Sequence, residues 1–121
     1  MVGPSPREQA QRLADEWYAA WNDHDLERIL SHYSDDVVFV SPFAVEIAGR
    51  ADGRLEGKEA LRAYFSAALE RFPDLRFEPI ALMVGIDSLV LHYRSVQNLL
   101  AAELMRVGSN GLVTEVIAHY G

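Results

Sequence analysis

Two stretches near the C-terminus decide the fold: SLVLHYRSVQ, residues 88–97, and LLAAELMRV, residues 99–107. Both are rich in apolar residues and read as buried strands that fold back on each other at Gln97-Asn98. Each strand carries an ionisable side chain near its middle, His92 in the first and Glu103 in the second. A turn at Gln97-Asn98 places His92 directly opposite Glu103, where paired Cβ atoms of antiparallel strands lie about 4.5 to 5.5 Å apart. The sequence therefore predicts a buried acid–base pair.

Two further strands flank this hairpin, residues 75–84 before it and residues 112–120 after it. Turn-forming residues separate the four strands, with Gly85-Ile86-Asp87 ahead of the hairpin and Gly108-Ser109-Asn110-Gly111 behind it. The C-terminal half therefore predicts an antiparallel meander.

The N-terminal half shows helical spacing instead. Ser5-Pro6-Arg7-Glu8 has the pattern of a capping box, and an apolar stripe follows it to about residue 22. A shorter helix is expected after Asp25 as its N-cap, and another over residues 58–72. Because helices come first and strands afterwards, the sequence predicts an α+β fold with N-terminal helices packed on a mostly antiparallel sheet.

The middle of the chain joins these two regions. Residues 37–41 predict a short strand that stops at Pro42, which cannot donate to a ladder. Residues 43–55 show no sustained period and contain two glycines, so we expect an irregular segment that acts as a lid or a pocket wall.

Length and composition limit the class of protein. A chain of 121 residues, 50% of them hydrophobic, predicts one globular domain over residues 1–121. The formal charge of -7, with only 11 Lys and Arg residues, argues against nucleic acid as a partner. No apolar run approaches the roughly 20 residues that span a bilayer, and no basic, apolar leader begins the chain. We therefore expect a cytoplasmic protein with no membrane partner.

Cofactor and metal signals are not found in the sequence. With no cysteine, the chain has neither disulfides nor thiolate sites. None of the four histidines makes a pair at metal-ligand spacing, and the glycines do not form a phosphate-binding loop. We expect neither a metal nor an organic cofactor.

Both faces of the last strands carry apolar residues, whereas a sheet open to water on one side would alternate cleanly. The helices can cover only one face, so we expect a second subunit on the other and predict a homodimer through the sheet face. The two predicted faces are Leu89, Leu91 and Leu104 on one, and Val90, Met105 and Val107 on the other.

The order of elements and several local strings carry a resemblance to a known family. The chain resembles the nuclear transport factor 2-like superfamily, and within it the SnoaL-like and ketosteroid-isomerase-like branches. The resemblance implies a cone-shaped fold, in which helices and a strongly curved sheet enclose a pocket for a small apolar molecule. It implies no single activity, because the superfamily includes isomerases, epoxide hydrolases, cyclases, dehydratases and binding domains. The strings are Tyr18-Ala-Ala-Trp-Asn22 through Asp25-Leu26, Tyr33-Ser-Asp-Asp-Val37, Leu55-Glu-Gly-Lys-Glu-Ala60 and Ala118-His-Tyr-Gly121.

The working residues of the isomerases transfer to this chain only in part. Their general-base aspartate falls on Ser41, which cannot act as that base. Their oxyanion-hole tyrosine falls on Trp17, although Tyr18 is adjacent. Their second oxyanion-hole acid, kept protonated by an apolar site, has its counterpart at Glu103. Isomerisation of steroids by that mechanism is therefore not expected.

The same resemblance selects the inward face of the sheet. With an even-length hairpin loop, His92 and Arg94 share that face, whereas a one-residue bulge reverses their assignment. The residues expected to point into the cone are Glu103, Met105, Val116, Ala118 and Tyr120.

These assignments give two sets of candidate site residues. His92 and Glu103 are the catalytic candidates, with the carboxylate orienting the imidazole; alternatively, the pair is a structural cross-strand bond or faces a subunit interface. Arg94 either holds an oxygen of the ligand, or only neutralises Glu103, or reaches solvent near the strand end. The aromatic residues form either a pocket wall or core. The substrate-binding candidates are Trp17, Ser41, Tyr64, Arg94, Met105 and Tyr120.

The leading functional hypothesis is a small cofactor-independent enzyme of the isomerase, cyclase, lyase or epoxide hydrolase type. Its substrate is expected to be an apolar molecule with a carbonyl group or an epoxide. The alternatives are a non-catalytic binding domain with the same pocket, and an interaction module that works through its sheet face.

Overall fold

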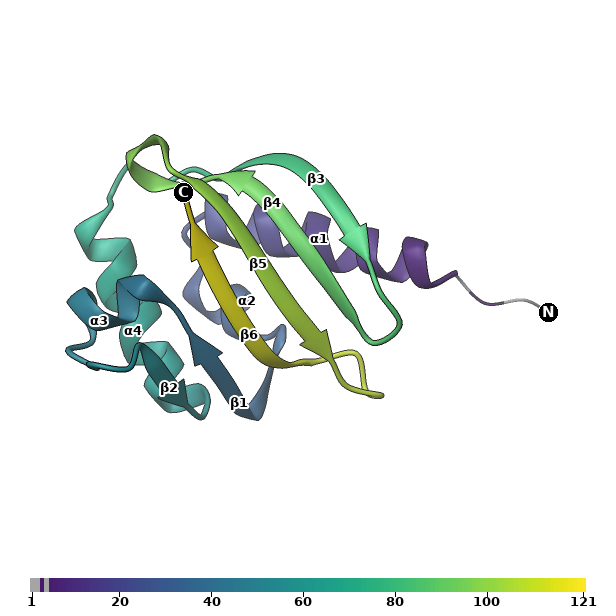
Figure 1. The fold of residues 1–121 in the computed structure, drawn as a ribbon, viewed down its shortest axis with the longest axis horizontal. Helices are drawn as coiled ribbons and strands as arrows, with labels where there is room; N and C mark the ends of the chain where they lie inside the picture. The colour runs from purple at the N-terminus through teal and green to yellow at the C-terminus, as the bar shows by residue number, and fades with distance from the viewer. Residues whose placement is uncertain (1–2, 4) are drawn as a thin grey trace.

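The structure is a computed structural model that describes residue 3 and residues 5–121 (Figure 1). Helices dominate the first half of the chain and strands the second, as the sequence predicts. The helices are α1 (Pro6–Asn22), α2 (Leu26–Leu30), α3 (Pro42–Ile47) and α4 (Lys58–Arg71), with a 3-10 turn η1 at Val96–Asn98. The strands are β1 (Tyr33–Val40), β2 (Arg54–Glu56), β3 (Glu78–Val84), β4 (Ser88–Arg94), β5 (Leu100–Val107) and β6 (Val113–Tyr120).

The six strands form one mixed sheet that does not close into a barrel, in the order β2-β1-β6-β5-β4-β3. The β1–β6 pair is parallel, and the other pairs are antiparallel. Figure 1 shows a strongly curved sheet with α1 and α2 behind it, while no helix of the described residues crosses in front of β4, β5 and β6. The prediction of an α+β fold with a mostly antiparallel, curved sheet is confirmed.

Helix α1 begins where the capping box predicts. Ser5 Oγ accepts a hydrogen bond from the backbone N–H of Glu8 at 3.1 Å, and the Glu8 carboxylate accepts one from the N–H of Ser5 at 3.5 Å. Intervals of four residues then turn Trp17 and Trp21 toward the sheet, where both are buried. Among the described residues, no helix has both the length and the apolarity needed to cross a membrane.

The segment predicted to be irregular, residues 43–55, contains regular structure. Helix α3 begins directly after Ser41, whose hydroxyl accepts a hydrogen bond from the N–H of Phe43 at 3.2 Å, and β2 follows it. Gly53 allows the chain to return against β1, because its φ is +65° and a Cβ there would lie 2.7 Å from the carbonyl oxygen of Ser41. The backbone N–H of Ser41 donates to Gly53 O at 2.9 Å, which holds this return in place.

The register between β4 and β5 differs by one residue from the predicted register. Leu91 is the cross-strand partner of Glu103, and His92 is the partner of Ala102. The connection explains the difference, because residues 95–99 form a five-residue loop in which Gln97 and Asn98 adopt left-handed φ values of 57° and 60°. An odd-length connection turns alternate side chains of β4 to the other face. The predicted pairing of His92 with Glu103 is therefore wrong.

The inner face of the sheet follows from this register. Tyr93 joins Glu103 and Met105 on the inner face, whereas His92 and Arg94 lie on the outer face. The expectation that His92 and Arg94 share the face of Glu103 is thus wrong, and so is the grouping of Leu104 with Leu89 and Leu91. The inward direction predicted for β5 and β6 is confirmed by the burial of Glu103, Met105, Val116 and Ala118, and by Tyr120, which lines a pocket.

Candidate functional site

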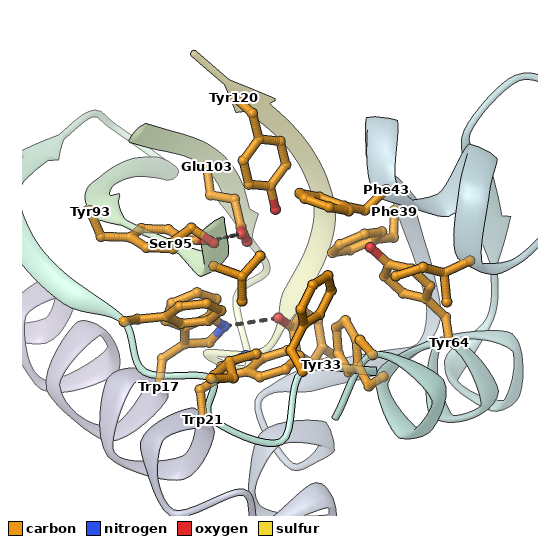
Figure 2. Close-up of a pocket in the computed structure, with 17 residues that line it drawn as sticks. Trp17, Trp21, Tyr33, Phe39, Phe43, Tyr64, Tyr93, Ser95, Glu103 and Tyr120 are labelled. Atoms are coloured by element: carbon orange, nitrogen blue, oxygen red, sulfur yellow. Dashed lines mark hydrogen bonds between the residues drawn. The ribbon is translucent and has the colours of Figure 1, made fainter. Parts of the chain in front are cut away.

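A pocket lies between the helices and the inner face of the sheet (Figure 2). It contains about 450 Å³ of empty space, including the open space at its mouth. Aromatic and aliphatic side chains make most of its wall, and Glu103 is the only formally charged residue among them. The lining residues are Trp17, Trp21, Tyr33, Phe39, Phe43, Ile47, Tyr64, Phe65, Ala68, Phe72, Leu75, Phe77, Tyr93, Ser95, Val96, Glu103 and Tyr120.

Glu103 is a buried carboxyl group in the middle of β5, with 4% of its surface exposed. The hydroxyl of Tyr93 on the neighbouring strand donates a hydrogen bond to Glu103 Oε1, drawn as a dashed line in Figure 2. The other oxygen, Oε2, is buried and has no hydrogen-bond partner among the described residues. A buried polar atom without a partner is costly, and among the described lining residues Glu103 Oε2 and Trp21 Nε1 are two such atoms, of which Oε2 is the acceptor.

Burial also changes the acidity of Glu103. The low polarity around the side chain disfavours the carboxylate and raises the pKa of Glu103 to about 7, although the hydrogen bond from Tyr93 acts in the opposite direction. A carboxyl group with a pKa near neutrality is present in both forms at physiological pH, so it can accept a proton and also return one.

All five tyrosines of the chain are grouped around this carboxyl group. Burial is the largest cause of a raised pKa for every one of them, and the charge of Glu103 raises each pKa further. The pKa of Tyr64, for example, rises to about 12. All five hydroxyl groups therefore stay protonated, and that of Tyr93 already donates to Glu103. They belong to Tyr18, Tyr33, Tyr64, Tyr93 and Tyr120.

The aromatic wall is fixed by contacts between α1 and the sheet. Trp17 Nε1 donates a hydrogen bond to the hydroxyl of Tyr33 at 2.9 Å, and the Trp17 ring stacks on Phe77 with 5.5 Å between centroids. Asn22 holds Phe77 by two hydrogen bonds, since its amide nitrogen donates to Phe77 O at 3.0 Å and its side-chain oxygen accepts from Phe77 N at 2.7 Å. The wall next to Glu103 is thus anchored before any ligand binds.

The pocket contains part of the predicted site. Trp17, Tyr64 and Tyr120 line it together with Glu103. Met105 faces inward but is fully buried in the core, outside the lining set. Ser41 also lies outside that set and caps α3. It is close to Tyr64 and Tyr120, since hydrogen bonding with Ser41 partly offsets the rise in the pKa of both tyrosines.

The other two predicted residues lie away from the pocket. His92 Nδ1 lies 2.9 Å from the carbonyl oxygen of Ala101, on the outer face. Arg94 donates to the carbonyl oxygen of Asn98 at 3.0 Å, next to the loop that sets the register. Neither contacts Glu103, so the structure does not bring the predicted catalytic pair together.

Tyr93 is the site residue that sequence reasoning missed. It follows His92 directly, and with the five-residue loop the alternation of β4 turns it inward beside Glu103. The signal was present as an alternation of Leu89, Leu91 and Tyr93, three large residues on one face. Among the described residues, no group of three histidine or acidic side chains is arranged to hold a metal ion.

Comparison with known proteins relates this pocket to a family. The model of the SnoaL-like domain matches residues 14–120. A crystal structure of a SnoaL-like protein of unknown function from Burkholderia thailandensis is 45% identical in sequence, with a TM-score of 0.92 over 98% of this chain and 99% of that chain. No functionally curated protein matches the chain.

More distant solved structures share the fold alone. A candidate ketosteroid isomerase from Kribbella flavida has a TM-score of 0.74 at 18% identity, covering 94% of this chain and 78% of that one. AclR, a candidate hydroxylase from Streptomyces galilaeus, has a TM-score of 0.73 at 23% identity, covering 97% of this chain and 91% of that one. Since the family model spans most of the sequence and a close relative carries the same description, the chain belongs to the SnoaL-like family.

Proposed function

We propose that this protein is a cofactor-independent enzyme that moves a proton within an apolar, carbonyl-bearing molecule held in the aromatic pocket. Glu103 is the acid–base group. The observation that carries the proposal is the free oxygen of Glu103, Oε2, which is buried in the pocket wall without a partner while Tyr93 holds the other oxygen.

The geometry supports a simple division of roles. Ionised Glu103 removes a proton from the carbon next to the carbonyl group: the C–H bond breaks, the proton joins Oε2, and the electron pair moves toward the carbonyl oxygen. Tyr120, whose hydroxyl points into the same space in Figure 2, donates a hydrogen bond to that oxygen as its charge grows. Protonated Glu103 then returns the proton, either to the same carbon, which gives exchange, or, where a C=C bond is conjugated with the enolate, to the far carbon of that bond, which shifts the double bond.

The lining restricts the class of substrate. No lysine, arginine or histidine lies among the lining residues, so the inner pocket has no positive charge that could bind an anion. Stacked and edge-on rings favour a flat, apolar body. We therefore place a small cyclic ketone or a related carbonyl compound in this pocket.

The test uses the bicyclic ketone 2-tetralone, whose exchange of protons next to the carbonyl can be followed in D₂O by ¹H NMR. We expect the wild-type protein to accelerate exchange above the buffer rate, increasingly so as pH rises through about 7. Glu103→Gln should lose at least about 100-fold of that acceleration, because general-base catalysis typically contributes 10² to 10⁴. Glu70→Gln, an exposed carboxyl on α4, is the matched control and should behave as wild type. Equal exchange by Glu103→Gln and wild type would contradict the proposal.

A non-catalytic binding domain is the second candidate. The observation that favours it is that the pocket lining contains a single carboxyl group, Glu103. The second acid–base group of the related isomerases is missing, because Ser41 stands in its place and caps α3. In that case, 2-tetralone should shift the indole signals of Trp17 and Trp21 in the NMR spectrum with no exchange beyond that in buffer.

We also propose that the uncovered face of the sheet meets a second copy of the chain. Successive register partners form an apolar stripe across five strands on this face. The Arg106–Glu115 ion pair, at 3.3 Å, lies beside the stripe and supplies both signs of charge, as a self-complementary contact requires. The stripe consists of Met83, Val90, Leu104, Ile117 and Val40.

A further inference from the structure

A second hollow lies directly outside the aromatic pocket, between the C-terminal end of α4 and the β4–β5 loop. The two spaces share four lining residues and therefore adjoin, and we refer to the outer hollow as the entrance. Its lining is Arg71, Phe72, Pro73, Asp74, Leu75, Arg76, Ser95, Val96 and Gln97, of which Phe72, Leu75, Ser95 and Val96 are shared.

The entrance differs in charge from both the inner pocket and the whole chain. Arg71 and Arg76 contribute two positive charges and Asp74 one negative charge, a local balance of +1 in a chain of formal charge -7. Neither arginine forms an ion pair with a carboxylate of the described residues, so both guanidinium groups are free to meet an anion.

Both arginines are attached to a fixed part of the pocket wall. The guanidinium of Arg71 lies 6.0 Å from the centroid of the Phe72 ring, at the boundary of the two spaces. Arg76 lies between two buried residues, Leu75 and Phe77, that are tied to the N-terminal part of the chain. His24 Nε2 lies 2.8 Å from Leu75 O, and the side chain of Asn22 holds Phe77. The backbone on both sides of Arg76 is therefore held in place, while both arginine side chains are exposed at the rim.

From this arrangement we propose that the ligand is amphipathic, with an apolar ring system in the aromatic pocket and an anionic group at the entrance beside Arg71 and Arg76. This inference rests on the proposed use of the inner pocket and adds the orientation and charge of its ligand. The inner wall has one acid and no cation, so a negative group is repelled there and attracted at the rim. The reactive end of the ligand consequently enters first and faces Glu103.

Two probes of the same shape test the inference: 4-phenylbutanoate, which is anionic, and 4-phenylbutanamide, which is neutral. We expect the wild-type protein to bind the carboxylate about fivefold more tightly in isothermal titration calorimetry at low salt, since each exposed ion pair contributes up to roughly 1 kcal/mol. The double variant Arg71→Gln/Arg76→Gln should remove this preference and leave amide binding unchanged. Asp74→Asn should strengthen carboxylate binding, because it removes the one negative charge of the entrance.

Arg12→Gln is the matched control, because Arg12 is an exposed arginine on α1 that lines neither space. It lowers the net charge by one, half of the change in the double variant, and should preserve the preference for the carboxylate. Equal affinity of the wild-type protein for the two probes would overturn the inference, as would a preference that survives in the double variant. Failure of both probes to bind would overturn it as well. The 2-tetralone experiment needs no anion, so the proposed function stands or falls separately.

Discussion

Glu103 is held in the core at a measurable cost to stability. Its reference pKa is 4.5 and its pKa in the folded protein is about 7, so the folded state binds a proton more tightly than the unfolded state. Below about pH 4.5 both states are protonated and nothing is lost. As pH rises through the interval up to 7, the unfolded state ionises first, and the free energy of unfolding falls by roughly 3 kcal/mol from this group.

Replacing the acid by its neutral isostere should therefore stabilise the protein at high pH. We expect Glu103→Gln to unfold at higher urea concentration than wild type at about pH 8, with a difference that shrinks toward about pH 5. Urea unfolding followed by tryptophan fluorescence measures this difference. Glu70→Gln again serves as control, since Glu70 is exposed. A Glu103→Gln variant that is equally destabilised at both pH values would show that the carboxylate is compensated in the folded state.

Single residues were predictable where a pattern of several residues supported them. Trp17, Tyr64 and Tyr120 line the pocket, which fits the pocket-wall alternative, and the inward direction of Tyr120 was expected from the family resemblance. His92 and Arg94 were predicted on the wrong face because their direction depended on the loop that follows them. They were chosen because their side chains can exchange protons or bind anions, but only the register decides which side chains of β4 meet Glu103.

The sequence predicts the long helix α1 but not the short helix α3. The capping box and the apolar stripe predict α1 to within the observed bounds. Helix α3 has only six residues, too few to show a period, and was absorbed into a predicted irregular segment. A signal existed nonetheless: Ser41-Pro42 repeats the arrangement of Ser5-Pro6, a hydroxyl N-cap followed by proline at the first helical position.

The return from α3 to β2 depends on a glycine that touches the backbone. Gly53 and Gly49 both have left-handed φ values, +65° and +69°, but only Gly53 has an atom in the place of a Cβ, Ser41 O at 2.7 Å. Gly49→Ala should cost about 1 kcal/mol for the backbone conformation alone, and Gly53→Ala about 3 kcal/mol because overpacking adds to it. Urea denaturation of the two variants measures the difference. Equal costs would mean that the contact with Ser41 relaxes freely.

For the molecule as a whole, the uncovered sheet face sets the expected state of assembly. Leu104 lies in the middle of the apolar stripe, and Asp at that position places a charge in the proposed contact. We expect wild type to have the mass of a dimer at micromolar concentration in light scattering, and Leu104→Asp the mass of a monomer. Ile86→Asp is the control, because Ile86 is fully exposed at a hairpin outside the stripe. A monomeric wild type would contradict the proposed dimer.

The overall architecture was predictable because it depends on features that many residues share. The order of helices before strands and the turn signals between strands point to one fold class, and no single residue can reverse them. The parallel β1–β6 pair was not predicted, since it joins segments about 80 residues apart and leaves no local signal. The same holds for the pocket, whose wall combines residues from both ends of the chain.

The five-residue loop between β4 and β5 also matters for anyone who wishes to redesign the pocket. The length of the loop decides which side chains of β4 face the pocket. One residue more or fewer would replace Leu89, Leu91 and Tyr93 on the inner face by Val90, His92 and Arg94. A library that varies wall residues other than Tyr93 keeps a phenol beside the acid. A library that varies the length of this loop instead places an imidazole there, through an insertion or deletion in the segment that directly follows β4.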